Sequence, residues 1–260
     1  MALFDKKTCD ICGGKIGLLG NRKLDDGNMC KDCAALLSPF MTDRRRTSIA
    51  DIKEHLAYRE ANLEKVTVFN VTRSLGTGTK ILLDENTSKF IITSAKRWQD
   101  GNPDVMDFSQ VTGCNVNIDE VRSEIKQKDK DGKDVSYNPQ RFVHEYNFNM
   151  VINVNSPWFS EIKFRLNNPA IKVEPPAGGR GLSMNRGAEV GRTSVAYRQC
   201  EQLAEEIKAV FTEVRQTMRE NITAANAPQI ARTCPHCGAT TIPDASGRCE
   251  FCGGAMTAMN

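Results

Sequence analysis

The pattern of apolar and polar positions first predicts a helix that ends near Lys65. Ser48 is followed three positions later by Asp51, an N-cap residue with an acidic partner. Apolar side chains then recur at near-helical spacing with charged residues between them: Ile49, Ile52, Leu56 and Leu63. From Val66 the period changes to two, so strands are expected to begin there.

The next hundred residues predict short antiparallel strands. Lys80–Asp84 and Lys89–Ser94 flank the turn Glu85–Ser88 and predict a hairpin. Further strands are expected in residues 65–75, 105–108, 113–119, 146–154 and 162–166. The charged stretch 126–133 is expected to be a solvent loop.

An amphipathic helix follows the strands. Its apolar side chains fall at steps of three and four over roughly six turns of ~3.6 residues. These positions are Cys200, Leu203, Ile207, Val210, Val214 and Met218. Strands followed by one such helix predict the α+β class, a small antiparallel barrel or sandwich whose open end the helix plugs.

The composition indicates the cellular compartment of the protein more clearly than its function. The 260 residues carry 35 basic and 32 acidic side chains, a net charge of +3, so nucleic-acid or membrane binding has to rest on local patches. The chain opens without an apolar signal segment, and no run approaches the ~20 apolar residues of a membrane helix. We therefore expect a cytoplasmic protein.

The cysteines carry the clearest chemistry. Eight of the ten stand in Cys-x-x-Cys pairs: Cys9, Cys12, Cys30 and Cys33 near the start, and Cys234, Cys237, Cys249 and Cys252 near the end. Two such pairs in succession supply four thiolates for a tetrahedral Zn²⁺, which predicts two closed, structural zinc ribbons and two zinc ions per chain. An iron–sulfur cluster and a redox dithiol are the alternatives. Two short strands around glycine turns are expected in residues 13–27.

Other candidate residues have ordinary interpretations. His236 is expected to face outward, His55 and His144 have no companion ligand, and no acid and base pair can be nominated. Cys114 and Cys200 are expected in the core. The segment 76–80 lacks the ending of a phosphate loop.

Two basic segments keep a nucleic-acid hypothesis open. Arg44–Arg46 is short and is interpreted as a solvated linker. The glycine-rich loop 174–193 carries Arg180, Arg186 and Arg192, which can contact RNA or an acidic surface, although no aromatic residue lies between them to stack bases. An ordinary flexible insertion is preferred for this loop.

The residues around the first cysteines also carry a resemblance. The stretch Cys9–Leu24, with Asp26-Gly27 and the pair Cys30 and Cys33, resembles a bacterial zinc-ribbon domain of unknown function. In that family a pleckstrin-homology-like region often follows, and the order of elements predicted for residues 66–219 is similar to that fold. The resemblance implies zinc at the eight cysteines and transfers no activity.

These observations predict four parts and one function. The parts are a four-cysteine zinc ribbon (1–40), a linker helix (41–65), a pleckstrin-homology-like domain (66–222) and a second four-cysteine zinc ribbon (223–260). The function expected is that of a non-enzymatic adaptor with a protein partner. A nucleic-acid-binding protein and a peripheral membrane protein are the alternatives.

Overall fold

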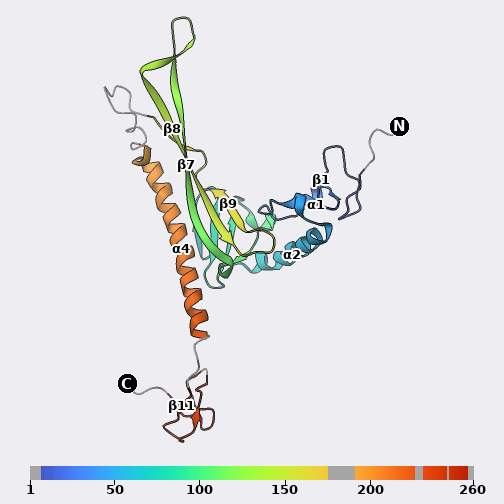
Figure 1. Cartoon of the computed structure of the whole chain (residues 1–260), viewed down its shortest axis with the longest axis vertical. Coiled ribbons are helices and arrows are strands. Elements are labelled where there is room, and N and C mark those ends of the chain that lie inside the picture. The colour runs from blue at the N-terminus through green and yellow to red at the C-terminus, as the bar shows by residue number, and fades with distance from the viewer. Residues whose placement is uncertain (1–6, 175–190, 226–230, 245, 257–260) are drawn as a thin grey trace. The chain divides into compact units, whose positions relative to one another are not determined.

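The computed structural model describes residues 7–174, 191–225, 231–244 and 246–256, with only the backbone at 218, 219 and 221–225. The chain forms two compact units, Met1–Arg215 and Gln216–Asn260. The first unit holds the amino-terminal ribbon, the sheets and most of the long helix (Figure 1). The second holds the carboxy-terminal ribbon. None of the described helices is long and apolar enough to cross a membrane.

The amino-terminal ribbon folds with very little regular structure. Strands β1 (Arg22–Lys23) and β2 (Asn28–Met29) pair antiparallel, and helix α1 (Lys31–Ala35) follows. Its buried apolar side chains outside the cysteines include Leu24, Met29 and Leu37. Of the two strands expected in residues 13–27, only β1 forms, and the glycine-rich stretch before it contributes an isolated bridge between Thr8 and Lys15.

A 20-residue helix, α2 (Ile49–Val68), connects the ribbon to the sheets. Ser48 and Asp51 form the predicted capping box, in which each side chain accepts a backbone N–H of the other. The expected strand at Val66 is wrong, because α2 continues to Val68 and buries Val66. The short 3₁₀ helix η1 (Arg44–Arg46) precedes α2.

The first sheet is a four-stranded antiparallel meander. It contains β3 (Arg73–Leu75), β4 (Lys80–Asp84), β5 (Lys89–Thr93) and β6 (Met106–Asp107). The predicted hairpin is confirmed, because Asp84 pairs with Lys89 across the expected turn. Apolar side chains of β4 and β5 are fully buried on both sides of the hairpin, among them Ile81, Leu83 and Ile91. The 3₁₀ helix η2 (Trp98–Gly101) lies between β5 and β6.

The 3₁₀ helix η3 (Phe108–Gln110) leads into the second sheet, which is built around two long strands. Strand β7 (Val111–Lys128) pairs with β8 (Asp134–Val154) along almost their whole length. On the other edge of β8 lie β9 (Glu161–Arg165) and β10 (Ile171–Val173). The loop expected at 126–133 is shorter than predicted, because β7 continues to Lys128 and only residues 129–133 lie between the strands.

Helix α4 (Val195–Ala225) packs its first half against both sheets. The ring of Phe211 contacts Phe90 of the first sheet at 5.1 Å between centroids, and the ring of Tyr197 contacts Phe148 of the second at 4.9 Å. Within the predicted apolar stripe, Ile207 and Val210 are buried, whereas the side chain of Met218 lies outside the described residues.

The fold class is therefore confirmed only at the level of a mixed helix and sheet protein with two four-cysteine groups. The predicted closed barrel is wrong for the described residues: the strands form two separate open sheets, since none of the described strands joins β3 or β6 to β7. The predicted order of antiparallel strands followed by one long helix is present. A pleckstrin-homology-like fold stays a prediction.

The carboxy-terminal unit contains one small ribbon. Strands β11 (Arg232–Thr233) and β12 (Thr240–Thr241) pair antiparallel, and a bridge joins Arg248 to Ala255. Its cluster of buried side chains consists of Cys234, Cys249 and Met256. Two of these three are predicted metal ligands, so the described part of this ribbon has hardly any apolar core of its own.

Candidate metal centres

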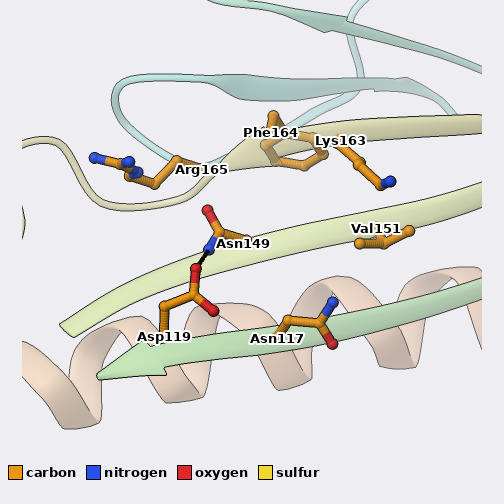
Figure 2. Close-up of a pocket in the computed structure, with 7 residues that line it drawn as sticks. All are labelled: Asn117, Asp119, Asn149, Val151, Lys163, Phe164 and Arg165. Carbon is orange, nitrogen blue, oxygen red and sulfur yellow. Dashed lines mark hydrogen bonds between the residues drawn. The ribbon is translucent and has the colours of Figure 1, made fainter. Parts of the chain in front are cut away.

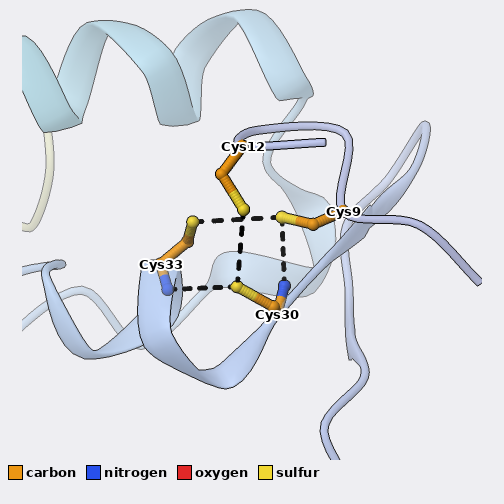
Figure 3. Close-up of side chains that lie close together, drawn as sticks. All are labelled: Cys9, Cys12, Cys30 and Cys33. Atoms are coloured by element: carbon orange, nitrogen blue, oxygen red, sulfur yellow. Dashed lines mark hydrogen bonds between the residues drawn. The ribbon is translucent and has the colours of Figure 1, made fainter. Parts of the chain in front are cut away.

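The first four cysteines converge on one point (Figure 3). Their four sulfur atoms all lie within 4.8 Å of one another. The Sγ atoms of Cys9 and Cys33 are 3.9 Å apart, as are those of Cys12 and Cys30. A tetrahedral site with Zn–S bonds of ~2.3 Å places its sulfur atoms about 3.8 Å apart, so the spacing fits a zinc ion.

The last four cysteines repeat this arrangement in the second unit. Their sulfur atoms also lie within 4.8 Å of one another. The Sγ atoms of Cys234 and Cys252 are 3.6 Å apart, and those of Cys237 and Cys249 are 3.7 Å apart. One member of each pair is buried and the other is exposed, so this cluster lies at the surface of a very small unit.

Three of the four Cys-x-x-Cys pairs share one backbone turn. In each, a glycine with φ near +70° follows the second cysteine and its N–H donates to the carbonyl of the first. The three bonds are Gly13 to Cys9 at 2.7 Å, Gly238 to Cys234 at 2.9 Å and Gly253 to Cys249 at 2.8 Å. Because this left-handed conformation disfavours other residues, the glycine after the pair is part of the ligand geometry.

The fourth pair opens a helix instead. Cys30 is the N-cap residue of α1, and its sulfur accepts the backbone N–H of Cys33 at 3.4 Å. The N–H of Cys30 in turn donates to the sulfur of Cys9 at 3.2 Å. A helix amino terminus and backbone donors both favour the thiolate form.

The thiols of the first cluster do not all ionise alike. Burial raises the pKa of Cys9, but backbone N–H groups from Cys12, Cys30 and Ile11 outweigh it and lower that pKa to about 6. Burial and the neighbouring sulfurs raise the pKa of Cys33 well above its usual range.

The second cluster shows the same division. Burial raises the pKa of Cys234, but backbone N–H groups outweigh it and lower that pKa to about 6. The backbone N–H of Ala239 lowers the pKa of Cys237, but the neighbouring sulfurs and burial together outweigh it and raise that pKa to about 12.

This asymmetry indicates what a metal ion would supply to each cluster. One thiolate forms readily, and its charge then opposes the others. A divalent cation at the centre removes that opposition, because it deprotonates the thiols that coordinate it. Four thiolates at tetrahedral spacing make each cluster able to bind a metal ion and consistent with zinc.

Comparison with known protein families gives a match over the amino-terminal ribbon. A family described as "Domain of unknown function (DUF4428)" matches residues 8–55. The match covers the first cysteine cluster and the first part of α2. No curated protein and no solved structure matches the chain.

The structure brings together all eight cysteines singled out in the sequence, as two groups of four. Their role as ligands stays a prediction. His236 is exposed, as expected, and packs beside Gly254. Cys114 and Cys200 are only half-buried, and burial raises the pKa of the Cys114 thiol to about 11, which keeps it protonated.

A buried polar network beside the first ribbon was missed by the sequence analysis. The carboxylate of Asp104 accepts a hydrogen bond from Ser38 Oγ at 2.7 Å and pairs with Arg59 Nη1 at 2.8 Å. Arg59 also donates through Nε to the carbonyl of Leu36 at 3.2 Å, and the N–H of Ser38 donates to His55 Nε2 at 3.0 Å. This network attaches the end of the ribbon and α2 to the chain that enters β6.

The helical spacing carried a signal for this network. The buried positions of α2 are Ile52, His55, Arg59, Asn62 and Val66, separated by steps of three and four. Three of the five are polar, so the apolar pattern identified only part of the buried face. Ile52 is buried and Ile49 and Leu56 pack against the core of the ribbon, as predicted, whereas Leu63 is half exposed. A polar residue at a helix position that the spacing predicts to be buried indicates a hydrogen-bond partner elsewhere in the chain.

The structure also pairs an acid with a base that the sequence did not suggest. His144 Nδ1 lies 2.8 Å from Glu120 Oε1, and Glu120 Oε2 lies 3.5 Å from Arg192. Burial raises the pKa of Glu120, but the hydrogen bond and charge of His144 and the charge of Arg192 bring it below its usual range. Arg192 comes from the glycine-rich loop, whose Arg180 and Arg186 lie outside the described residues.

A shallow hollow of about 340 Å³ lies on the second sheet (Figure 2). Its lining residues are Asn117, Asp119, Asn149, Val151, Lys163, Phe164 and Arg165. Asn149 Nδ2 donates to Asp119 Oδ2 at 2.7 Å, and Lys163 pairs with Glu161 at 2.6 Å. These groups satisfy one another across the sheet surface, so the hollow offers no converging set of reactive groups among the described residues.

Proposed function

We propose that the protein is a non-enzymatic zinc-binding adaptor that acts through protein–protein contacts in the cytoplasm, where thiols stay reduced. One observation carries the proposal. At the tip of the amino-terminal ribbon, Leu18 is 83% exposed and its neighbour Leu19 is 88% exposed. Single exposed apolar residues are common, but two adjacent leucines at a loop tip are typical of a contact site.

The tip is held in place by its own backbone. Gly17 and Gly20 bracket the leucines, and the N–H of Gly20 donates to the carbonyl of Gly17 at 2.9 Å. Arg22 Nη1 donates to the carbonyl of Leu19 at 3.2 Å. The leucines are therefore presented to solvent by an ordered turn, and an apolar groove on a partner would bury them.

The ribbon that carries this tip is itself attached to the rest of its unit. The hydrogen bonds of Ser38 and Arg59 to Asp104 fix the end of the ribbon, and a fixed contact loses little freedom when it binds. The closed four-sulfur sites support a structural role for zinc, because a catalytic zinc keeps one position open for water. Zinc then maintains the surface that the partner recognises.

Affinity purification from the protein's own cells tests this function. We expect the intact chain to recover one or a few proteins at ~150 mM salt, and Leu18→Ser with Leu19→Ser to lose them. Phe251→Ser is the matched control, because Phe251 is 71% exposed on the other ribbon. Equal recovery by both variants, or recovery of no protein, would reject the leucine tip as the contact.

A second candidate, nucleic-acid binding, rests on a separate observation. Burial lowers the pKa of the Arg44 guanidinium, and the nearby charges of Arg22 and Arg45 lower it further, so three like charges lie close together. Phosphate binding would relieve this repulsion. Submicromolar RNA binding at ~150 mM salt, lost in Arg44→Ala with Arg45→Ala but kept in the leucine variant, would favour this candidate. Anionic vesicles serve as a third arm, because they test the membrane alternative.

A further inference from the structure

Strand β7 has one edge that no strand covers in the described part of the chain. Among the described strands it pairs only with β8. Beyond Arg122 and His144, where β9 and β10 no longer reach, the described parts of β7 and β8 pair only with each other and form a two-stranded arm (Figure 1). A two-stranded ribbon is marginally stable in water, and its edges can accept a further strand.

The two edges of the arm differ. On β8 the pairing shifts between Arg141 and Ser136, so that Tyr137–Gln140 stand opposite no residue of β7, and Pro139 within this bulge has no N–H to donate. Strand β7 has neither proline nor glycine from Cys114 to Lys128. The edge of β7 is therefore the one suited to accept another strand.

The charges on β7 alternate in sign along one face. Glu120, Arg122, Glu124 and Lys126 occupy every second position, and side chains two apart on a strand share a face. The other face carries Val121 and Ile125, with Ser123 between them. In an antiparallel pair of two such strands with Ser123 opposite Ser123, each of these four charged residues lies opposite a residue of the other sign. On the other face, Val121 lies opposite Ile125.

We propose that two copies of this chain pair antiparallel through β7, with the two-fold axis at Ser123. Directly opposed residues in such a pair share a face and lie within contact of each other. Arg122 of one copy then stands opposite Glu124 of the other, and Glu120 stands opposite Lys126. Val121 and Ile125 oppose each other on the other face, as the symmetry of a two-fold interface requires.

The charge order also excludes the neighbouring registers. A two-fold axis perpendicular to the sheet has to pass through a residue of β7, so the axis can move only in whole residues. An axis at Arg122 would oppose Glu120 to Glu124, and an axis at Glu124 would oppose Arg122 to Lys126. Like charges directly opposite one another are unfavourable, so the pairing at Ser123 is favoured over a shift of the axis by one residue, which moves every opposed partner by two residues.

Two features of the arm fit this partner. Glu124 Oε1 is buried without a hydrogen-bond partner among the described residues, so this side chain would gain one by turning outward to the opposing arginine of a second copy. Val121 is 50% exposed although it is β-branched and lies in a strand. Both groups lie within two residues of the proposed axis.

Charge reversal in the full zinc-loaded chain tests the pairing by sedimentation velocity over a concentration series. We expect a dimer for the unchanged chain, and a dissociation constant raised about tenfold or more by Arg122→Glu or Glu124→Arg, since each reverses two contacts across the axis. The two reversals combined should restore the dimer, because every opposed pair is again of opposite sign. Glu161→Lys with Lys163→Glu is the matched control and should change nothing, because this exposed pair lies on β9.

Hydrogen exchange gives an independent measurement that needs no variant. Amides of residues 118–128 should exchange more slowly as the protein concentration rises, whereas those of 134–142 should not change. Circular dichroism identifies any variant whose arm has unfolded, which matters because Arg122 also lies over the ring of Phe142. A monomer at all concentrations, unchanged association in the single reversals or no rescue in the combined variant would each overturn the proposal.

Discussion

The two ribbons each bring four cysteines together but differ in what surrounds them. Around the amino-terminal cluster lie buried Leu24, Met29 and Leu37 of the ribbon and Ile52 of α2. Around the carboxy-terminal cluster the only buried apolar side chain among the described residues other than cysteine is Met256. Since the turns at Cys9, Cys234 and Cys249 are alike, the difference lies outside the ligand loops.

The two ribbons should differ in how far their folding depends on metal and on packing. A ribbon without an apolar core depends on its metal for nearly all of its folding energy. The amino-terminal ribbon adds an apolar cluster and the hydrogen bonds of Ser38, Arg59 and Asp104. Its structure should therefore depend on both metal and packing, and each dependence can be tested.

Metal removal should have the largest effect. Structural zinc sites contribute an apparent ~10 to 16 kcal/mol, so a strong chelator should unfold residues 231–256 completely. In the first ribbon it should release residues 8–33 while Ser38 and α2 stay protected by packing. Hydrogen exchange before and after chelation measures both regions, and elemental analysis should find two zinc ions per chain beforehand. Equal loss of protection in residues 36–62 and 231–256 would show that packing does not hold the end of the first ribbon and α2 once the metal is removed.

Breaking the buried ion pair should have the next largest effect. The side chains of Arg59 and Asp104 are 7% and 0% exposed, and Arg59→Met leaves the carboxylate buried without its partner. Such a loss costs about 3 to 5 kcal/mol, so the first unit should unfold at lower denaturant concentration. Hydrogen exchange of residues 231–256 in the same variant is the internal control and should not change. A stability loss below about 1 kcal/mol would show that the network does not hold the ribbon.

The sequence alone predicted the two four-cysteine clusters far better than the packing around them. Cys-x-x-Cys pairs indicate their own geometry, because the spacing of the ligands is local and the glycine that follows is visible in the chain. Ser38 and Asp104 are distant in sequence, and nothing local in either residue indicates a contact with the other. The amino-acid pattern therefore identified the clusters and missed the network that attaches one of them.

The sheets show the same limit. The hairpin of β4 and β5 was predicted to the residue at its turn, because the turn and the alternation are local. The lengths of β7 and β8 were underestimated because the distal arm is exposed and its charged residues resemble a loop. Closure of the barrel depends on which distant strands pair, and short-range alternation contains no information about that.

Acidification should reveal the packing of the first ribbon through His55. Burial, and then the charge of Arg59, lower its pKa from 6.5 to about 4. The unfolded chain therefore takes up this proton at higher pH than the folded chain, and the free energy of unfolding falls between pH 6.5 and 4, by about 3 kcal/mol in total. Above pH 6.5 this group contributes no pH dependence.

His55→Gln isolates that contribution. Glutamine keeps an oxygen that can accept the N–H of Ser38 but does not titrate in this range. Protonation of the cysteine ligands affects both chains equally, so the difference between their unfolding free energies should change between pH 6.5 and 4 and remain constant above. A difference that does not vary with pH would show that His55 is accessible to protons in the folded chain.

The smallest effect should come from the turns that the two ribbons share. Gly13 and Gly238 have φ of +72° and +74°, and a Cβ added at either would meet no atom within 4 Å. Alanine therefore costs only the left-handed conformation, about 1 to 2 kcal/mol at each position, or roughly a tenfold loss of zinc affinity. Competition with a chromogenic chelator measures Gly13→Ala and Gly238→Ala in the full chain. Equal losses would place the difference between the ribbons outside their ligand turns, whereas a much larger loss at Gly238 would mean that the packing around the first cluster also compensates for strain in its turn.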